Sequence, residues 1–372
     1  MATQESLRVP QLEELTIVDA DSHLSVGAET LAGYLDRSNA ARRIIETGDV
    51  GSEVMTTARA SPAFPNDSSG YDEDADVVPG GAGDPDAKLE YMEEFDLDYS
   101  ILTAGSGLGT INHDQTAVAW AHAYNSWLLD EWVDADERLN AALLVAHHVP
   151  EKAVEEIERM ADEDQIVAVQ MPAAGQIPPA GHWSYDPIYE AAQDHGLPVI
   201  YHTADQTSVS TFPVQFRWAE TFAESHAFSF PVEGMWHLIS LVFNGVPERF
   251  PDLEFVFQEP GFEWLPWMMW RLDDHYLQYS EDLPGLRKMP SAYIRDQCYI
   301  TTQPLGHTEN HQHMGWAMEM AGAAETLLFA TDHPHPDFDP PTEVYRPARS
   351  HLGAEDIQGI MGETALDVFG LR

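Results

Sequence analysis

Acidic and imidazole side chains stand close together near the amino terminus, in the segment TIVDADSHLS at residues 16–25. A short run of β-favouring residues there leads into Asp19, Asp21 and His23. Because Asp21 and His23 are two positions apart, an extended backbone would point both side chains to the same side. A carboxylate oxygen and an imidazole nitrogen so arranged supply half of a divalent-metal site. The alternative is an ordinary turn in which His23 bonds to the backbone.

Residues of the same types directly follow three more short apolar runs. They are His202 in LPVIYHT, Gln258 and Glu259 in LEFVFQEPG, and Asp332, His333 and His335 in LLFATDHPH. In a chain with 17 histidines, one histidine at such a place could be accidental. Four strand ends carry such residues: Asp-x-His, His, Glu and Asp. Together they predict a metal site, if the fold brings them to one pocket.

The elements that must position these residues alternate between strand-like and helical segments. The strand-like segments are TIVDA, DYSILTA, LNAALLVA, QIVAVQMP, LPVIYHT, LEFVFQE, QCYITTQ and TLLFATD. Such short apolar runs are typical of parallel strands that helices cover on both faces. The alternation predicts a (β/α)8 TIM barrel, whose active site lies at the carboxyl ends of the strands. An open doubly wound sheet is the alternative, although no glycine-rich phosphate loop follows the first strand.

Length and composition favour one large domain. The 372 residues, 44% of them apolar, suffice for a single α/β domain, which we expect over residues 1–372. Within it, residues 47–86 are rich in Gly, Pro, Ser and Asp and predict a long surface loop. The single cysteine, Cys298, excludes a disulfide framework and a cysteine-based zinc cluster. Neither a secretion signal nor an apolar run of about 18 residues is found, so we expect a cytoplasmic protein without a membrane span.

Acidic residues outnumber basic ones, 63 to 18, for a formal net charge of -45. A surface with so few bases cannot neutralise phosphates, which argues against nucleic-acid binding. The acids are spread between ordinary apolar runs, and their mutual repulsion weakens as salt screens it. The composition therefore predicts a protein from an extreme halophile and says little about the substrate.

The order of the strand-end residues resembles the amidohydrolase superfamily. Within it, the chain is similar to the amidohydrolase-related (family 2) group, which contains aminocarboxymuconate-semialdehyde and resorcylate-type decarboxylases. The resemblance covers most of the chain, including YDPIYEAAQDHGLPVIYHT, GVPERFPDLEFVFQEPGFEWLPWMMWRLD and LLFATDHPH. It implies one divalent metal ion, usually zinc, held by Asp21, His23, His202 and Asp332. Superfamily members with two metal ions bridge them by a carboxylated lysine at the fourth strand, where this chain has Gln170 and no lysine.

We expect Asp332, Glu259 and His202 to take part in catalysis. In the decarboxylases of this group a histidine follows the sixth strand and transfers protons beside the metal, whereas this chain has Glu259 there. A glutamate can do so near neutral pH only if burial raises its pKa above the usual value of about 4.3. Decarboxylation of a small aromatic or unsaturated carboxylic acid is slightly favoured. Hydrolysis of an amide, ester or lactone is the alternative, and a non-catalytic binding protein a remote one.

Three further residues are candidates for contact with the substrate or with the metal ligands. His335 lies three residues after Asp332 and either lines the pocket or fixes a turn between prolines. Arg217 and Arg295 are candidate clamps for a substrate carboxylate, because arginine offers a bidentate fork and bases are scarce here. His333 is interpreted as structural. The expected partners are a small-molecule substrate and, in a homodimer, a second copy of the chain.

Overall fold

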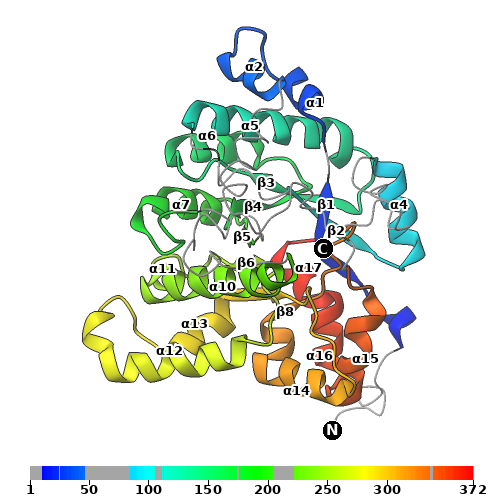
Figure 1. Ribbon diagram of the computed structural model, residues 1–372, viewed down its shortest axis with the longest axis vertical. Helices are drawn as coiled ribbons and strands as arrows, with labels where there is room; N and C mark the ends of the chain where they lie inside the picture. Colours follow the sequence, from blue (N-terminus) through cyan, green and yellow to red (C-terminus); the bar gives the residue numbers. More distant parts are fainter. Residues whose placement is uncertain are drawn as a thin grey trace.

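The computed structural model describes residues 11–24, 26–46, 84–104, 111, 113–173, 176–203, 222–335 and 338–371. Within these residues, eight parallel strands lie side by side in chain order, and helices surround them (Figure 1). The strands are β1 (Val18–Leu24), β2 (Tyr99–Ala104), β3 (Leu139–Leu144), β4 (Ile166–Pro172), β5 (Val199–His202), β6 (Phe255–Gln258), β7 (Cys298–Thr301) and β8 (Leu327–Leu328). The predicted TIM barrel is confirmed.

Helices connect and cover the strands (Figure 1). They are α1 (Ala28–Gly33), α2 (Ala40–Glu46), α4 (Pro85–Glu94), α5 (Asp114–Leu128), α6 (Pro150–Met160), α7 (Asp186–Asp194), α10 (Phe222–Phe243), α11 (Val246–Arg249), α12 (Leu265–Tyr279), α13 (Pro290–Gln297), α14 (His311–Ala321), α15 (Pro341–His351), α16 (Ala354–Gln358) and α17 (Thr364–Val368). Several begin with proline, as in α4, α6 and α13, because the first helical turn has no use for the missing N–H group.

The barrel closes where β1 meets the segment around the end of β8. Three backbone N–H groups donate across this seam to carbonyl oxygens 2.9–3.0 Å away: Ala20 to Phe329, Asp332 to Asp21, and His23 to His333. Ser22 and His333 also form a parallel bridge. The closure therefore brings the first and last polar strand ends of the sequence into direct contact.

Apolar side chains fill the inside of the barrel. They come from successive strands and include Val18, Ala20, Ile101, Ala142, Ala168, Ile200, Val256 and Leu328. Side chains of α17 and of the residue that follows it, among them Leu366 and Phe369, belong to the same buried cluster. The carboxyl-terminal helix thus closes one end of the barrel with apolar groups, and the polar strand ends lie at the other.

The fold does not test every prediction made from the sequence. Most of the loop predicted at 47–86 falls outside the described residues, and its last positions begin helix α4. No helix in the described part of the chain is long and apolar enough to cross a membrane. The single domain, the homodimer, the cytoplasmic location and the halophilic origin stay predictions.

Candidate metal centre

Four buried side chains meet at the carboxyl-terminal end of the barrel. They come from β1, from the end of β5 and from the segment after β8: Asp21, His23, His202 and Asp332. Nε2 of His23 lies 2.8 Å from Oδ1 of Asp332 and 3.1 Å from Nε2 of His202. Nε2 of His202 lies 3.6 Å from Oδ2 of Asp21. The structure therefore brings together the four side chains that the resemblance assigned to a metal ion.

The hydrogen bonds of these side chains leave lone pairs directed into the cluster. Nδ1 of His202 donates to the carbonyl oxygen of Thr203 at 2.7 Å, so Nε2 of the neutral ring carries a lone pair that faces the other ligands. Oδ1 of Asp21 accepts a hydrogen bond from Thr103, whereas Oδ2 is buried with no hydrogen-bond partner among the described residues. Burying such acceptors together is costly unless a cation binds between them. The residues therefore fit a divalent metal ion.

Burial and neighbouring charges shift the pKa values of these groups. Burial and, to a smaller extent, the adjacent His23 lower the pKa of His202 to about 3. Burial also lowers the pKa of His23. Burial, followed by the charge of Asp332, raises the pKa of Asp21 well above its usual range. Both imidazoles are therefore neutral near pH 7, as metal ligands must be, and a bound cation would stabilise the ionised form of Asp21.

An irregularity in β1 aims the first ligand into the barrel. The register between β1 and β2 shifts between Asp19 and Ser22. Ala20 belongs to the apolar core inside the barrel, and Asp21, directly after it, also faces inward, next to His202. Two consecutive side chains share a side at a β-bulge, and bulges are common next to active sites. The predicted end of the first strand at residue 20 is therefore wrong, because β1 continues through the bulge and contains the candidate ligands.

Glu259 and His335 lie beside the four candidate ligands. Oε2 of Glu259 is 3.6 Å from Nε2 of His202, and Oε1 of Glu259 is 3.9 Å from Nδ1 of His335. Nδ1 of His335 also lies 2.8 Å from Oδ1 of Asp332. The side chain of His335 is 35% exposed, whereas that of Asp332 is fully buried. His335 therefore lies between the buried ligands and solvent, where it can contact a substrate.

The backbone is strained at two residues of this cluster. Glu259 and Asp332 have φ angles of 65° and 62°, in the left-handed region that favours glycine. Such a conformation costs roughly 1–3 kcal/mol and is concentrated at functional sites. The N–H group of Glu259 donates to Oγ1 of Thr301 at 3.0 Å, and that of Asp332 donates across the seam to Asp21 at 3.0 Å. These bonds hold both side chains toward the cluster.

The structure does not bring the predicted arginine clamps to the cluster. Arg295 lies in the last turn of α13, directly before β7, and therefore at the amino-terminal end of the barrel. Its Nη1 atom forms an ion pair with Glu325 at 2.7 Å, and its side chain is 38% exposed. The proposed contact between Arg295 and a substrate carboxylate is thus wrong. Arg217 lies outside the described residues.

Sequence analysis missed Lys88, which is fully buried in α4 behind the candidate ligands. Its Nζ atom donates to Oγ of Ser22 at 2.7 Å and lies 3.2 Å from Nδ1 of His333. Burial lowers the pKa of Lys88 to about 8, and three nearby carboxylates oppose this shift. A signal was present, since Lys88 shares the buried face of its helix with Tyr91 and Met92 at helical spacing.

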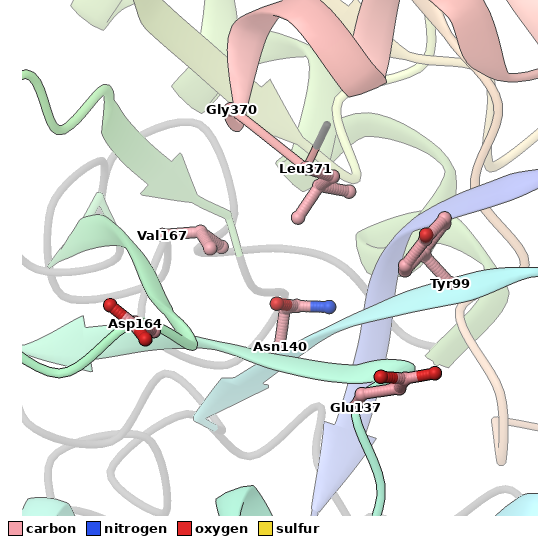
Figure 2. A pocket seen from close by; sticks show the side chains of 7 residues that line it. All are labelled: Tyr99, Glu137, Asn140, Asp164, Val167, Gly370 and Leu371. Atoms are coloured by element: carbon pink, nitrogen blue, oxygen red, sulfur yellow. The ribbon is translucent and has the colours of Figure 1, made fainter.

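A separate cavity lies at the amino-terminal end of the barrel (Figure 2). It measures about 270 Å³ and is lined by Tyr99, Glu137, Asn140, Asp164, Val167, Gly370 and Leu371. These residues include no histidine and no non-glycine residue with a positive φ angle. The cavity therefore lacks the features that mark the cluster at the opposite end, and we assign it no part in the reaction.

Comparison with known proteins identifies relatives along nearly the whole chain. The sequence profile of the family described as Amidohydrolase matches residues 18–371. A gamma-resorcylate decarboxylase from Rhizobium sp. (strain MTP-10005) is 21% identical over 268 residues, which are 68% of this chain and 78% of that protein.

Solved structures share the fold. A 5-carboxyvanillate decarboxylase from Sphingomonas paucimobilis superposes with a TM-score of 0.71 at 18% identity, over 96% of this chain and 100% of that one. A second 5-carboxyvanillate decarboxylase, from Novosphingobium aromaticivorans, was solved with manganese and 4-hydroxy-3-methoxy-5-nitrobenzoic acid. Its TM-score is 0.70 at 18% identity, over 99% of this chain and 100% of that one.

Proposed function

Because the chain belongs to the amidohydrolase family, we propose that it is a decarboxylase of a small aromatic or unsaturated carboxylic acid, with one divalent metal ion held by Asp21, His23, His202 and Asp332. The observation that carries the proposal is the convergence of these four buried side chains. Nε2 of His202 lies 3.6 Å from Oδ2 of Asp21, an oxygen without a hydrogen-bond partner in the described part of the chain. Named relatives that are decarboxylases support the choice of reaction.

A bound divalent ion would supply positive charge that orients substrate oxygens and stabilises negative charge as CO2 leaves. Zinc is the ion that the resemblance implies, and manganese is the ion in structural relatives. Both are therefore to be tested. The imidazoles of His23 and His202, neutral near pH 7, present lone pairs without having to lose a proton first.

Decarboxylation replaces a carbon–carboxylate bond by a carbon–hydrogen bond, so a side chain must deliver one proton to that carbon. Glu259 suits this role, because it is only 7% exposed and lies beside His202. Asp332 is less suited. Burial raises its pKa, but His335 and His23 beside it more than offset this, so the pKa ends below its usual range. Asp332 therefore remains ionised and holds its position among the ligands, while Glu259 transfers the proton.

Hydrolysis of an ester, lactone or amide is the second candidate. The observation that favours it is Glu259 itself, which stands where the decarboxylases of the group have a histidine. A carboxylate at this place can accept a proton from an attacking water molecule instead of delivering one to carbon.

A paired substrate screen tests the proposal. Protein loaded with zinc or manganese would be incubated in about 1 M KCl, where charges are screened within roughly 3 Å, with hydroxybenzoic and unsaturated carboxylic acids. Released CO2 would be trapped and counted. An ester, lactone and amide panel would run in parallel. Metal-dependent CO2 release supports the decarboxylase. Turnover confined to the second panel would replace it by a hydrolase, and a metal-loaded protein inactive on both panels would point to a binding protein.

A further inference from the structure

We propose that Lys88 is a positioning residue for the metal centre, whose buried ammonium group ties β1 to the segment after β8 and so fixes His23 relative to Asp332. The inference rests on the proposed metal centre. It concerns the side of the barrel wall that faces away from the ligands, where α4 packs over the seam between the first and last strands.

The ammonium group of Lys88 contacts both sides of that seam. Nζ donates to Oγ of Ser22 at 2.7 Å and approaches the carbonyl oxygen of His23 at 3.4 Å, both in β1. On the other side it lies 3.2 Å from Nδ1 and 3.4 Å from the carbonyl oxygen of His333. The ammonium group, which has three N–H donors, thus bridges β1 and the segment after β8, which meet at the barrel seam.

These two segments carry ligands that must lie close together. Ser22 directly precedes His23, and His333 directly follows Asp332. Lys88 contacts Ser22 and His333, the direct neighbours of the two ligands, and so holds the segments that carry the ligand pair. Nε2 of His23 and Oδ1 of Asp332 are 2.8 Å apart. A shift of either segment would therefore directly change the distance between these two candidate metal-ligand atoms.

The surroundings of Lys88 exclude water and strengthen these contacts. The ring of Tyr91 stacks on that of His333, with centroids 3.5 Å apart, and Phe338 packs against both rings. Hydrogen bonds in such a dry environment are stronger than in water, and the loss of one is costly. Lys88 also places a positive charge near three buried carboxylates, those of Asp19, Asp21 and Asp332. Loss of this charge alone would favour a bound cation, so a rise in the Kd of a Lys88 variant reports lost positioning and not lost charge.

A second buried contact crosses the seam beside Lys88. Asp19 accepts hydrogen bonds from the backbone N–H and from Oγ1 of Thr331, each at 2.7 Å. Because this contact and the backbone bonds of the seam remain in a Lys88 variant, the barrel should still close without the ammonium group. Lys88 therefore acts on the geometry of the ligands rather than on the existence of the fold.

Metal titration of the metal-free protein tests the inference. Lys88→Met keeps the length and apolar stem of the side chain but removes its donors and charge. Groups that support metal ligands typically change metal affinity 10–100-fold, so we expect the Kd for Mn²⁺ or Zn²⁺ to rise by about that factor, as measured by calorimetry. Lys152→Met is the matched control, because Lys152 is exposed on α6 and pairs only with Glu155 among the described residues.

Ser22→Ala provides a second variant that retains the ammonium group and removes its shortest contact, the 2.7 Å hydrogen bond to Oγ of Ser22. We expect a smaller rise in Kd than in Lys88→Met. The double variant should bind no more weakly than Lys88→Met, because both changes remove the same bond. Circular dichroism and thermal unfolding of each metal-free protein would show that the fold persists.

The outcomes separate this inference from the proposed function. Wild-type protein that binds neither metal would overturn both. Wild-type binding with unchanged Kd values in folded Lys88→Met and in Ser22→Ala would overturn only the role of Lys88. If Lys88→Met does not fold, the Kd of Ser22→Ala decides alone: weakened binding supports the inference and unchanged binding contradicts it.

Discussion

The two ends of the barrel are filled in opposite ways. At the amino-terminal end, apolar side chains such as Leu366 and Phe369 pack against the inner residues of the strands. At the carboxyl-terminal end, the same strands end in carboxylates and imidazoles, and Oδ2 of Asp21 is buried without a partner among the described residues. Apolar burial lowers the free energy of the folded state, whereas burial of unpaired polar groups raises it. The difference indicates that one end stabilises the fold while the other is shaped for chemistry.

Strained backbone is found within the cluster of candidate ligands, although not only there. The strained residues Glu259 and Asp332 both follow strands at the carboxyl-terminal end. Around the amino-terminal cavity, the lining residue with a left-handed backbone is Gly370, with a φ angle of 64°, for which that conformation carries no steric cost. Asp96, shortly before β2, and Ala323, shortly before β8, also have positive φ angles, of 53° and 48°. Backbone strain therefore marks the site only where it coincides with residues of the cluster, as at Glu259 and Asp332.

The largest expected effect comes from removing a ligand at the carboxyl-terminal end. His202→Ala deletes the lone pair that faces the cluster, so the protein should lose its metal, and turnover should fall at least about 10³-fold because a metal ion supplies several kcal/mol of charge stabilisation. Elemental analysis and the CO2 assay would measure both. His313→Ala, on the exposed surface of α14, is the control and should keep its metal. A metal-loaded His202→Ala protein would mean that the ligand set is misassigned.

Removing the neighbouring carboxylate should affect the reaction without affecting the metal. Glu259→Gln keeps the size and hydrogen bonding of the side chain but cannot transfer a proton, so turnover should fall by roughly 10²–10⁴-fold while metal content persists. Loss of metal would instead make Glu259 a ligand. Unchanged turnover would assign the proton to another group.

At the opposite end, a large truncation should affect stability alone. Phe369 is 3% exposed within the inner apolar cluster, and Phe369→Ala should lower the free energy of unfolding by about 3–5 kcal/mol. Urea denaturation at constant high KCl concentration would measure the loss. Turnover per folded molecule should match that of the wild-type protein. A reduced value would show that the two ends are coupled and that the contrast between them is incomplete.

The sequence predicted most of this architecture because its signals are local. Apolar runs set the eight strands, and residues that directly follow or end a strand fall at the same end of the barrel. The bulge in β1 could not be predicted, since it is a property of pairing with β2. Lys88 escaped notice because its contacts with Ser22 and His333 span 66 and 245 positions. The error over Arg295 was avoidable, because a residue that directly precedes a strand belongs to the opposite end from one that follows it.

A buried histidine near the carboxyl-terminal end should make stability depend on pH. Nε2 of His237 donates to the carbonyl oxygen of Ala173 at 3.1 Å, and Nδ1 accepts from the N–H group of Ala180 at 3.2 Å. Burial lowers the pKa of His237 to about 4. The unfolded chain, with a histidine pKa of about 6.5, therefore binds more protons than the folded one between these values, and stability falls as pH falls through this range.

The contribution amounts to about 1.4 kcal/mol per pH unit, or about 2 kcal/mol at pH 5. His237→Gln can form the same two hydrogen bonds but does not titrate. The stability difference between wild type and variant should therefore shift by about 2 kcal/mol in favour of the variant from pH 7 to pH 5. Urea denaturation at both pH values would measure it. A constant difference would show that His237 titrates normally in the folded protein.

The smallest expected effect comes from removing a carboxylate at the amino-terminal cavity. This change is the control for Glu259→Gln at the opposite end of the barrel. Glu137 lines that cavity and is exposed (Figure 2). Glu137→Gln removes the same chemical group as Glu259→Gln, but from a place with no histidine and no strained ligand beside it. Turnover should stay within about twofold of wild type, and stability should change by no more than about 0.5 kcal/mol, as for other exposed positions. A tenfold loss of turnover would place part of the reaction machinery at the amino-terminal end, and the assignment of chemistry to one end of the barrel would fail.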